Sequence, residues 1–384
     1  MPGLRAYALV RFRGALGSEL VWPRYDDHFD ALLAFVELER ERWRLRAGRQ
    51  QRLSGLGHYT FDGASGSWRP LEPLRLEAFA GRGLARGFLE PLTSGAIRSI
   101  DPLRPDEATM FLGAQASATR GPWNATAAWQ REILADRSVL VSERASFDAR
   151  GTVGRRLLLQ GSIDGDLAAG AVGKARISAG FSSRLGYVEA ELFRYRPVFD
   201  LTTIWGVFSP EAHHGFAMLA QTGWLRTVTL QARLRHRWYA PVTETTPFLI
   251  GVSDQSTEFS LGGRWQRGTL GFGATWRLLT GYGGAQSGAD LDASWMSDDE
   301  RWQAGLLVTA FQEEEQFRVA DGTVFGAGLR LRGAFTPRLA ARGDLMRYWH
   351  RPDEGDAMVN WSQLRASLGV EWTFGASADR VRAR

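Results

Sequence analysis

Arginine recurs at every second position near the end of the segment TVTLQARLRHRW, residues 227–238. The arginines are Arg233, Arg235 and Arg237, and the alternate positions carry Val228, Leu230, Ala232 and Leu234. Because successive side chains of a β-strand point to opposite faces, the pattern predicts one apolar face and one arginine face. A guanidinium stays ionised at any relevant pH, and its planar fork suits phosphate, sulfate and carboxylate. The chemistry that this row could perform is therefore the attraction of anions.

Further arginines occupy equivalent positions in other alternating segments: Arg44, Arg46, Arg264, Arg277, Arg330, Arg332, Arg342 and Arg365. Acidic residues share these faces, namely Glu77, Glu258, Asp290, Asp292, Asp344 and Glu371. An arginine that faces lipid at the midplane of a bilayer costs roughly 2–4 kcal/mol, whereas a wet lumen removes that cost. We expect the arginines to line a water-filled pore. Two alternatives stay open: arginines that pair with the acids and fill a closed interior, or a soluble sandwich whose arginine face meets water.

The strands that must position these arginines are long. Alternation of apolar and polar residues continues through Gly268–Leu279, Trp302–Ala310, Val324–Phe335 and Leu364–Phe374. About ten residues suffice for a tilted strand to cross a bilayer, whereas soluble strands average roughly half that length. The longest apolar run is only Ala31–Val36, which excludes a helical membrane protein.

Short turns and longer links alternate along the chain. Short turns are expected near Glu39–Arg42, Pro70–Pro73, Gly121–Pro122, Thr152–Gly154, Arg184–Gly186, Gly223–Leu225, Arg267–Gly268, Ser297–Glu300 and Thr336–Pro337. Longer polar links are expected at Gly14–His28, Leu84–Glu107, Arg196–Gly215, Tyr239–Asp254, Gln312–Gly322 and Arg351–Asn360. The sequence thus predicts an all-β fold, a transmembrane antiparallel up-and-down β-barrel of about 18 strands (roughly 16–20). We expect a single barrel over residues 1–375, followed by a periplasmic tail, residues 376–384.

Tryptophan, of which the chain has 15, falls mostly near the ends of the expected strands. The residues concerned are Trp43, Trp123, Trp129, Trp238, Trp265, Trp276, Trp302, Trp349 and Trp372. Aromatic residues at strand ends are typical of the girdles that a membrane barrel places at the two bilayer surfaces. The alternative is ordinary tryptophan in a β-sheet core.

Three stretches near the N-terminus and one near the C-terminus resemble a known family. WRLRAGRQ (43–50), FDG (61–63) and LRLEAFAGR (74–82) are similar to early strands of porin-like outer-membrane barrels, with alginate-export and phosphate-selective porins the most similar types. LRASLGVEWTF (364–374) resembles the last-strand signal that the barrel-assembly machinery recognises, with Phe374 as its aromatic residue. That aromatic is normally the final residue of the family, whereas Gly375–Arg384 follow here. The resemblance implies a barrel and a pore without identifying a solute.

The sequence gives little support for a metal site, a catalytic site or a nucleic-acid-binding surface. His213 and His214 are adjacent, so on a strand they would point to opposite faces and would rarely bind one metal ion. Neither a G-x-S-x-G nucleophile elbow nor a phosphate-binding loop is present. The net charge of +5 comes from basic residues that are spread along the chain and balanced by 42 acids. We therefore expect no enzyme activity, no cofactor, no metal site and no nucleic-acid partner.

The segment RPVFDLTTIWGVFSPEAHHG (196–215) is unusually apolar for an exposed loop. If it folds into the barrel, Ile204, Trp205 and Phe208 would pack against the wall and form a constriction. The alternatives are a contact on the outer surface or a strand that extends above the membrane.

The pattern favours passive passage of small hydrophilic, preferentially anionic solutes through a porin-like channel of the bacterial outer membrane. The expected partners are outer-membrane lipid and lipopolysaccharide, the barrel-assembly machinery and small anionic solutes, and homo-oligomerisation is left open. Met1–Arg13 lacks a signal peptide, so one is expected upstream of Met1. A plugged scaffold barrel is the alternative, followed by a soluble all-β binding protein.

Overall fold

The computed structural model describes residues 3–12, 29–83, 109–135, 138–196, 212–223, 225–240, 253–282, 285–314, 322–352 and 360–372. All regular secondary structure within these ranges is β-strand, and the ranges hold 20 strands of 9 to 15 residues. No helix in them is long and apolar enough to cross a membrane. The predicted all-β, antiparallel fold is confirmed, with a strand count at the upper end of the expected range.

The chain divides into two compact units. Unit 1 comprises Met1–Ser178 and Phe193–Ala212, and unit 2 comprises Ala179–Leu192 and His213–Arg384. Two strands, β10 (Ala171–Ser182) and β11 (Gly186–Tyr195), contribute residues to both units.

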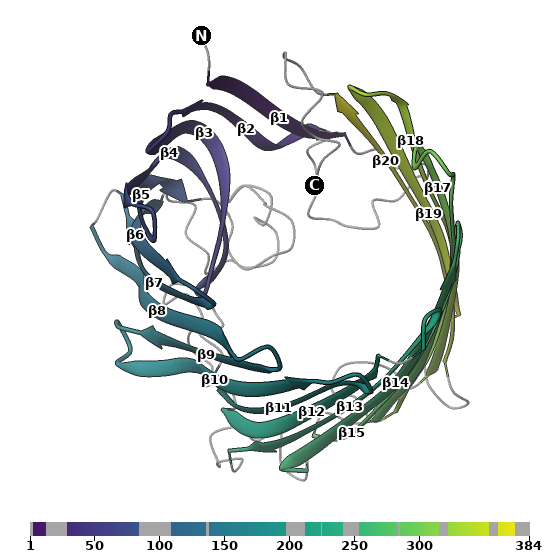
Figure 1. The fold of residues 1–384 in the computed structure, drawn as a ribbon. Helices are drawn as coiled ribbons and strands as arrows, with labels where there is room; N and C mark the ends of the chain where they lie inside the picture. The colour runs from purple at the N-terminus through teal and green to yellow at the C-terminus, as the bar shows by residue number, and fades with distance from the viewer. Residues whose placement is uncertain are drawn as a thin grey trace. The chain divides into compact units, whose positions relative to one another are not determined.

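Unit 1 is a curved antiparallel sheet in which each strand pairs with the next one along the chain (Figure 1). Its strands are β1 (Leu4–Phe12), β2 (Phe29–Glu39), β3 (Trp43–Ser54), β4 (Gly57–Leu71), β5 (Leu74–Gly83), β6 (Thr109–Arg120), β7 (Trp123–Leu134), β8 (Leu140–Val153) and β9 (Leu157–Asp166).

Unit 2 repeats the same up-and-down order, again with every strand antiparallel to its predecessor. Its strands are β12 (His213–Thr222), β13 (Val228–Tyr239), β14 (Gln255–Arg267), β15 (Leu270–Gly281), β16 (Ala285–Met296), β17 (Trp302–Glu314), β18 (Gly322–Thr336), β19 (Leu339–Pro352) and β20 (Trp361–Trp372).

Each short turn expected from the sequence separates two neighbouring strands, but the turns at Gly55–Leu56 and Leu167–Gly170 are not among those predicted. Gly121 and Gly268 adopt φ of 58° in the turns that follow β6 and β14, a conformation that glycine adopts without steric cost. Ser297 stabilises the turn before β17, because its Oγ accepts a hydrogen bond from the Trp302 amide at 3.0 Å. Two predicted boundaries are wrong by three residues: the link expected over 196–215 ends earlier, since β12 begins at His213, and the link expected over 312–322 begins later, since β17 (Trp302–Glu314) ends at Glu314.

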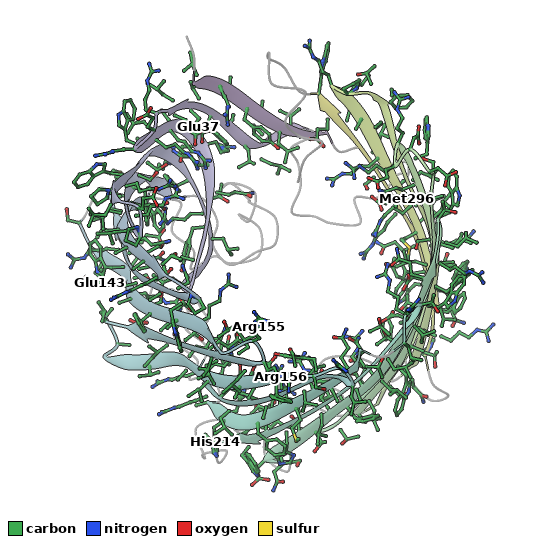
Figure 2. All side chains as sticks on the ribbon, viewed as in Figure 1. Glu37, Glu143, Arg155, Arg156, His214 and Met296 are labelled. Carbon is green, nitrogen blue, oxygen red and sulfur yellow. The ribbon has the colours of Figure 1, made fainter. Side chains whose placement is uncertain are left out.

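The two faces of each sheet differ in polarity. In unit 2, Leu234 lies opposite Phe259, and Leu261 lies opposite both Ala232 and Trp276. Leu261, Leu291 and Leu306 of this apolar face are 52 to 58% exposed, so no second layer of unit 2 covers them within the described residues. His214 lies on this apolar, convex side, whereas Met296 lies on the polar side (Figure 2). The apolar rows of unit 2 therefore do not form a packed interior.

Aromatic side chains border the apolar face of unit 2 at both edges. The short-turn edge carries Trp265, Phe272, Trp295, Trp302, Phe335 and Trp372, and the opposite edge carries Phe216, Trp238, Phe325 and Trp349. Along β13, Val228 pairs with Trp265, and Trp238 lies ten residues later. Ten residues span ~34 Å of strand, which corresponds to ~25 Å of membrane depth at a typical barrel tilt. This height matches the apolar band of outer-membrane barrels.

The buried core of unit 1 lies on its polar face. Six residues form the aromatic cluster, defined as Leu56, Tyr59, Phe61, Phe79, Phe111 and Ala128. The Phe111 ring is 5.2 to 5.5 Å from those of Tyr59, Phe61 and Phe79, measured between ring centroids. The tip of the β3–β4 hairpin folds over this face, because Leu56 accepts a 3.0 Å hydrogen bond from Arg144 of β8.

Candidate pore-lining face

The register of unit 2 places nine of the predicted arginines on one face. They are Arg233, Arg235, Arg237, Arg264, Arg277, Arg330, Arg332, Arg342 and Arg365. Glu258, Asp290, Asp292, Asp344 and Glu371 share the same face. We call this surface the arginine face. The face arises because side chains alternate strictly along β12–β20 and because residues paired across neighbouring strands project from the same side of the sheet.

Some arginines of this face are neutralised by carboxylates on the next strand. The Arg237 guanidinium lies 2.7 Å from the Glu258 carboxylate, and the Arg277 guanidinium lies 2.9 Å from the Asp290 carboxylate. Arg330 is 2.7 Å from Asp344. The interactions of Arg277 and Arg330 are largely exposed to water, so each contributes little to stability.

Other arginines keep an uncompensated charge. Within the described part of the chain, Arg233, Arg264, Arg332 and Arg342 form no ion pair, and Arg365 instead donates to Gln363 Oε1 at 2.7 Å. Arg235 is not among them, because its guanidinium lies 3.9 Å from the Glu191 carboxylate. The arginine face thus carries a surplus of positive charge, which concentrates anions when a low-dielectric wall surrounds it.

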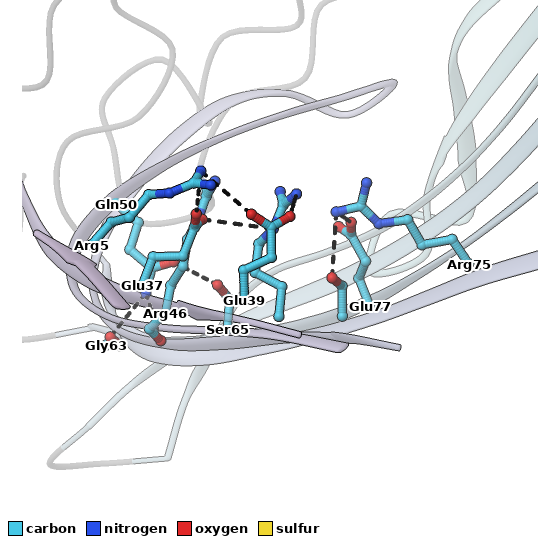
Figure 3. A network of polar contacts seen from close by, with 11 residues as sticks. Arg5, Glu37, Glu39, Arg46, Gln50, Gly63, Ser65, Arg75 and Glu77 are labelled. Carbon is cyan, nitrogen blue, oxygen red and sulfur yellow. Dashed lines mark hydrogen bonds and ion pairs between the residues drawn. The ribbon is translucent and has the colours of Figure 1, made fainter. Parts of the chain in front are cut away.

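Arg44 and Arg46 belong to unit 1, where each is paired with a glutamate, and Figure 3 shows Arg46 beside Glu37. Arg44 donates to Glu39 at 2.8 Å, and Arg46 donates to Glu37. Arg5 lies 3.4 Å from Glu39, and the Glu37 side chain is only 8% exposed. These two arginines therefore occupy a compensated network, the arrangement that the sequence offered as the alternative to pore lining.

Charged groups also border the aromatic cluster of unit 1. Arg52 lies 2.9 Å from Glu77 and donates to Gln115 at 2.7 Å, and its guanidinium stacks 4.2 Å from the centre of the Phe79 ring. On the far side of the cluster, Arg144 donates to the Tyr59 hydroxyl at 3.1 Å and to Asp164 at 2.9 Å. The polar face of unit 1 around the aromatic cluster is therefore filled with packed side chains.

Sequence reasoning missed this filling, although a signal was present. Tyr59, Phe61, Phe79 and Phe111 share the strand face of the charged residues, and Phe79 lies two positions after Glu77. Large aromatics on the charged side of a strand indicate packing on that side, not water.

The predicted constriction residues Ile204, Trp205 and Phe208 lie outside the described residues. His213 and His214 fall on opposite faces of β12, where they pair with Tyr239 and Trp238 respectively. Among the described residues, no group of three His, Asp or Glu side chains is placed to hold a metal ion.

Comparison with known proteins gives structural neighbours only. No family model and no curated protein matches the sequence. Among solved structures, the chain is similar to Pseudomonas aeruginosa OccK10 (OpdN), with 11% identity, 97% of this chain and 99% of that chain covered, and a TM-score of 0.49. It is similar to a BenF-like porin from Pseudomonas fluorescens Pf-5 (9%, 96% and 96%, TM-score 0.47). It is also similar to an anion-selective porin from Comamonas acidovorans (12%, 79% and 97%, TM-score 0.41).

Proposed function

We propose that the chain is a transmembrane β-barrel of the bacterial outer membrane, through which small hydrophilic solutes, preferentially anions, diffuse passively. The observation that carries the proposal is the sidedness of β12–β20. One face is apolar and is bordered by aromatic residues about 25 Å apart, and the other carries a surplus of arginine. A water-soluble sheet would instead bury such an apolar face against another layer.

The mechanism needs only shape and charge. Guanidinium groups on a wet wall replace part of the hydration of an entering anion and repel cations, so anions are concentrated at the wall. No covalent step or cofactor is part of the proposal.

Arg347 illustrates how the apolar face tolerates a charge. It lies on the apolar face opposite Ala327 and Leu364, and its guanidinium stacks 5.3 Å from the centre of the Trp349 ring, near the strand end.

A second candidate is a plugged barrel that serves as a scaffold. It is favoured by the aromatic cluster and the β3–β4 hairpin, which occupy the polar face of unit 1. Lipopolysaccharide and the barrel-assembly machinery are partners under both candidates. The single-barrel boundary at residue 375 and the periplasmic tail after it also remain part of the proposal.

The test is single-channel recording in a planar bilayer under a KCl gradient. We expect discrete conductance steps and a reversal potential on the anion-selective side. The double variant Arg233→Gln/Arg264→Gln removes two arginines that lack ion pairs among the described residues, and it should shift the reversal potential toward zero. Arg347→Gln is the matched control, because it removes a charge from the apolar face and should leave selectivity unchanged. A folded, inserted protein without conductance would favour the scaffold.

A further inference from the structure

Four aromatic side chains gather on the arginine face of unit 2, at the edge opposite the short turns. Phe311 of β17, Val324 of β18, His350 of β19 and Trp361 of β20 lie opposite one another in a single row across the four strands. Tyr348 lies two residues before His350 and therefore on the same face. We call Phe311, Tyr348, His350 and Trp361 the rim patch. Because they project from the side of the arginines, they are separate from the aromatic residues that border the apolar face.

Stacking and close packing hold the rings of the rim patch in place. The His350 imidazole stacks on the Trp361 indole, with ring centroids 5.4 Å apart and planes inclined by 11°. A Cβ atom at Gly322 would lie 2.9 Å from His350 Nε2, and one at Gly326 would lie 2.9 Å from Tyr348 Cδ1. These two glycines of β18 therefore leave the space in which both rings of β19 lie against the sheet.

Two members of the rim patch differ sharply in exposure. His350 is only 8% exposed, and its Nδ1 has no hydrogen-bond partner among the described residues, whereas Trp361 is 42% exposed. A buried ring nitrogen without a partner is unfavourable, so the imidazole contributes by stacking and not by hydrogen bonding. The imidazole thus supports the indole from one side, while part of the indole stays accessible.

Polar groups follow the accessible indole along β20. Gln363 and Arg365 lie two and four residues after Trp361, on the same face. Arg365 Nε donates to Gln363 Oε1 at 2.7 Å, and its guanidinium lies 5.3 Å from the centre of the Tyr348 ring. These contacts orient Arg365 but leave its terminal NH2 groups and the Gln363 amide NH2 group as donors. An accessible ring and several donors therefore share one line, ~14 Å long from Trp361 to Arg365.

We propose that the rim patch, with Gln363 and Arg365, forms a binding site for an uncharged oligosaccharide. The inference rests on the proposed function only in that the polar face of unit 2 must be wet. One sugar ring places its C–H face on the exposed indole of Trp361, because C–H hydrogens carry partial positive charge and the face of an aromatic ring is negative. Hydroxyl groups of the next sugar unit accept hydrogen bonds from Gln363 and Arg365.

A sugar matches this surface better than a flat aromatic solute or a small inorganic anion does. An aromatic solute would also stack on Trp361, but it would displace water from the donors of Gln363 and Arg365 without offering acceptors in return. A small anion would use Arg365 alone and would leave the rings without a contact. A sugar combines an apolar ring face with hydroxyl groups, and so it engages both parts of the site.

Saturation-transfer difference NMR with maltohexaose tests the site without requiring a conducting pore. The full chain, refolded in a zwitterionic detergent, is titrated with the sugar, and the transferred signal gives both the affinity and the contacting protons. We expect the strongest transfer to C–H protons of one ring face. Trp361→Ala should weaken binding by about tenfold or more, the scale on which the loss of a stacked ring acts, whereas Trp361→Phe should retain most of it. Gln363→Ala should weaken binding by about threefold.

Trp372→Ala is the matched control. Trp372 lies on the same strand and is 63% exposed, but it projects from the apolar face, opposite Leu339. Its loss should leave the affinity for maltohexaose unchanged. Equal losses from Trp361→Ala and Trp372→Ala would show a general effect on the sheet and overturn the site. A wild-type chain that binds no maltohexaose would also overturn it, whether or not the chain binds caffeine, a flat aromatic probe. Maltohexaose binding by a chain that does not conduct would reject the pore and leave the site standing, and conductance without maltohexaose binding would do the reverse.

Discussion

Replacing Arg144 with glutamine should destabilise unit 1 far more than the same change at Arg277 destabilises unit 2. The two arginines have the same ion-pair geometry. Arg144 lies 2.9 Å from Asp164, and Arg277 lies 2.9 Å from Asp290. They differ in exposure, because the Arg144 and Asp164 side chains are 11% and 9% exposed, against 59% and 46% for Arg277 and Asp290. The two ion pairs therefore differ mainly in burial, and Arg144 makes two further hydrogen bonds.

The expected magnitudes follow from this difference. Removing one partner of a buried ion pair costs about 3–5 kcal/mol, since the remaining charge stays buried without compensation. Arg144 also donates to the Leu56 carbonyl and the Tyr59 hydroxyl, so the hairpin loses its link to β8 as well. An exposed pair contributes only about 0.2–1 kcal/mol. We expect Arg144→Gln to cost roughly 3–5 kcal/mol and Arg277→Gln less than about 1 kcal/mol.

Urea titration of the protein refolded into lipid vesicles, followed by tryptophan fluorescence, measures both free energies of unfolding. The double variant Arg144→Gln/Asp164→Asn should recover part of the loss, because it removes the uncompensated carboxylate. Equal costs for Arg144→Gln and Arg277→Gln would refute the claim that the Arg144–Asp164 pair is buried beside the aromatic cluster. The absence of any recovery in the double variant would assign the cost to lost packing alone.

Two further predictions concern the hairpin tip and a turn. A Cβ atom at Gly55 would lie 2.2 Å from Asp148 Oδ2, the end of a side chain that must move aside, and 2.7 Å from Ser146 Oγ. Once Asp148 has moved, Gly55→Cys/Ser146→Cys should form a disulfide in a chain without other cysteines. A reducible mobility shift on a denaturing gel reports it, and failure to cross-link would place the hairpin elsewhere. In the turn before β17, hydrogen bonds from Ser297 Oγ at 2.6 Å and from the Arg301 amide lower the pKa of Asp299. The ionised form is thus favoured in the folded state, and its stabilisation is lost as the pH falls through the lowered pKa. Ser297→Ala should raise the pKa of Asp299, and an unchanged carboxyl titration by NMR would contradict this.

Local sequence chemistry predicted most of the fold. Strict alternation around Phe272 and Leu306 marks strands because a two-residue period suits no other regular structure, and Gly121 and Gly268 mark turns that need positive φ. The same alternation assigns the arginines of unit 2 to one face, since side-chain direction in a strand follows from parity alone.

What the sequence could not predict depends on register and on distant contacts. Arg330 meets Asp344 while Arg332 meets Arg342, and only the alignment of β18 with β19 decides which arginine has a partner. Arg44 and Arg46 were grouped with the other arginines because parity does not reveal that Glu37 and Glu39 lie opposite them. Leu56 and Arg144 are 88 residues apart, so no local pattern indicates their contact.

That separation also orders the assembly of unit 1. The tip of the β3–β4 hairpin can form its hydrogen bond with Arg144 only once β8 is in place, and β5, β6 and β7 lie between the hairpin and β8 in the sheet. Bringing such distant residues together carries a loop-closure entropy, which slows the step. Until that contact forms, the Leu56 carbonyl and the Tyr59 hydroxyl lack the Arg144 donor that fixes the hairpin tip over the polar face.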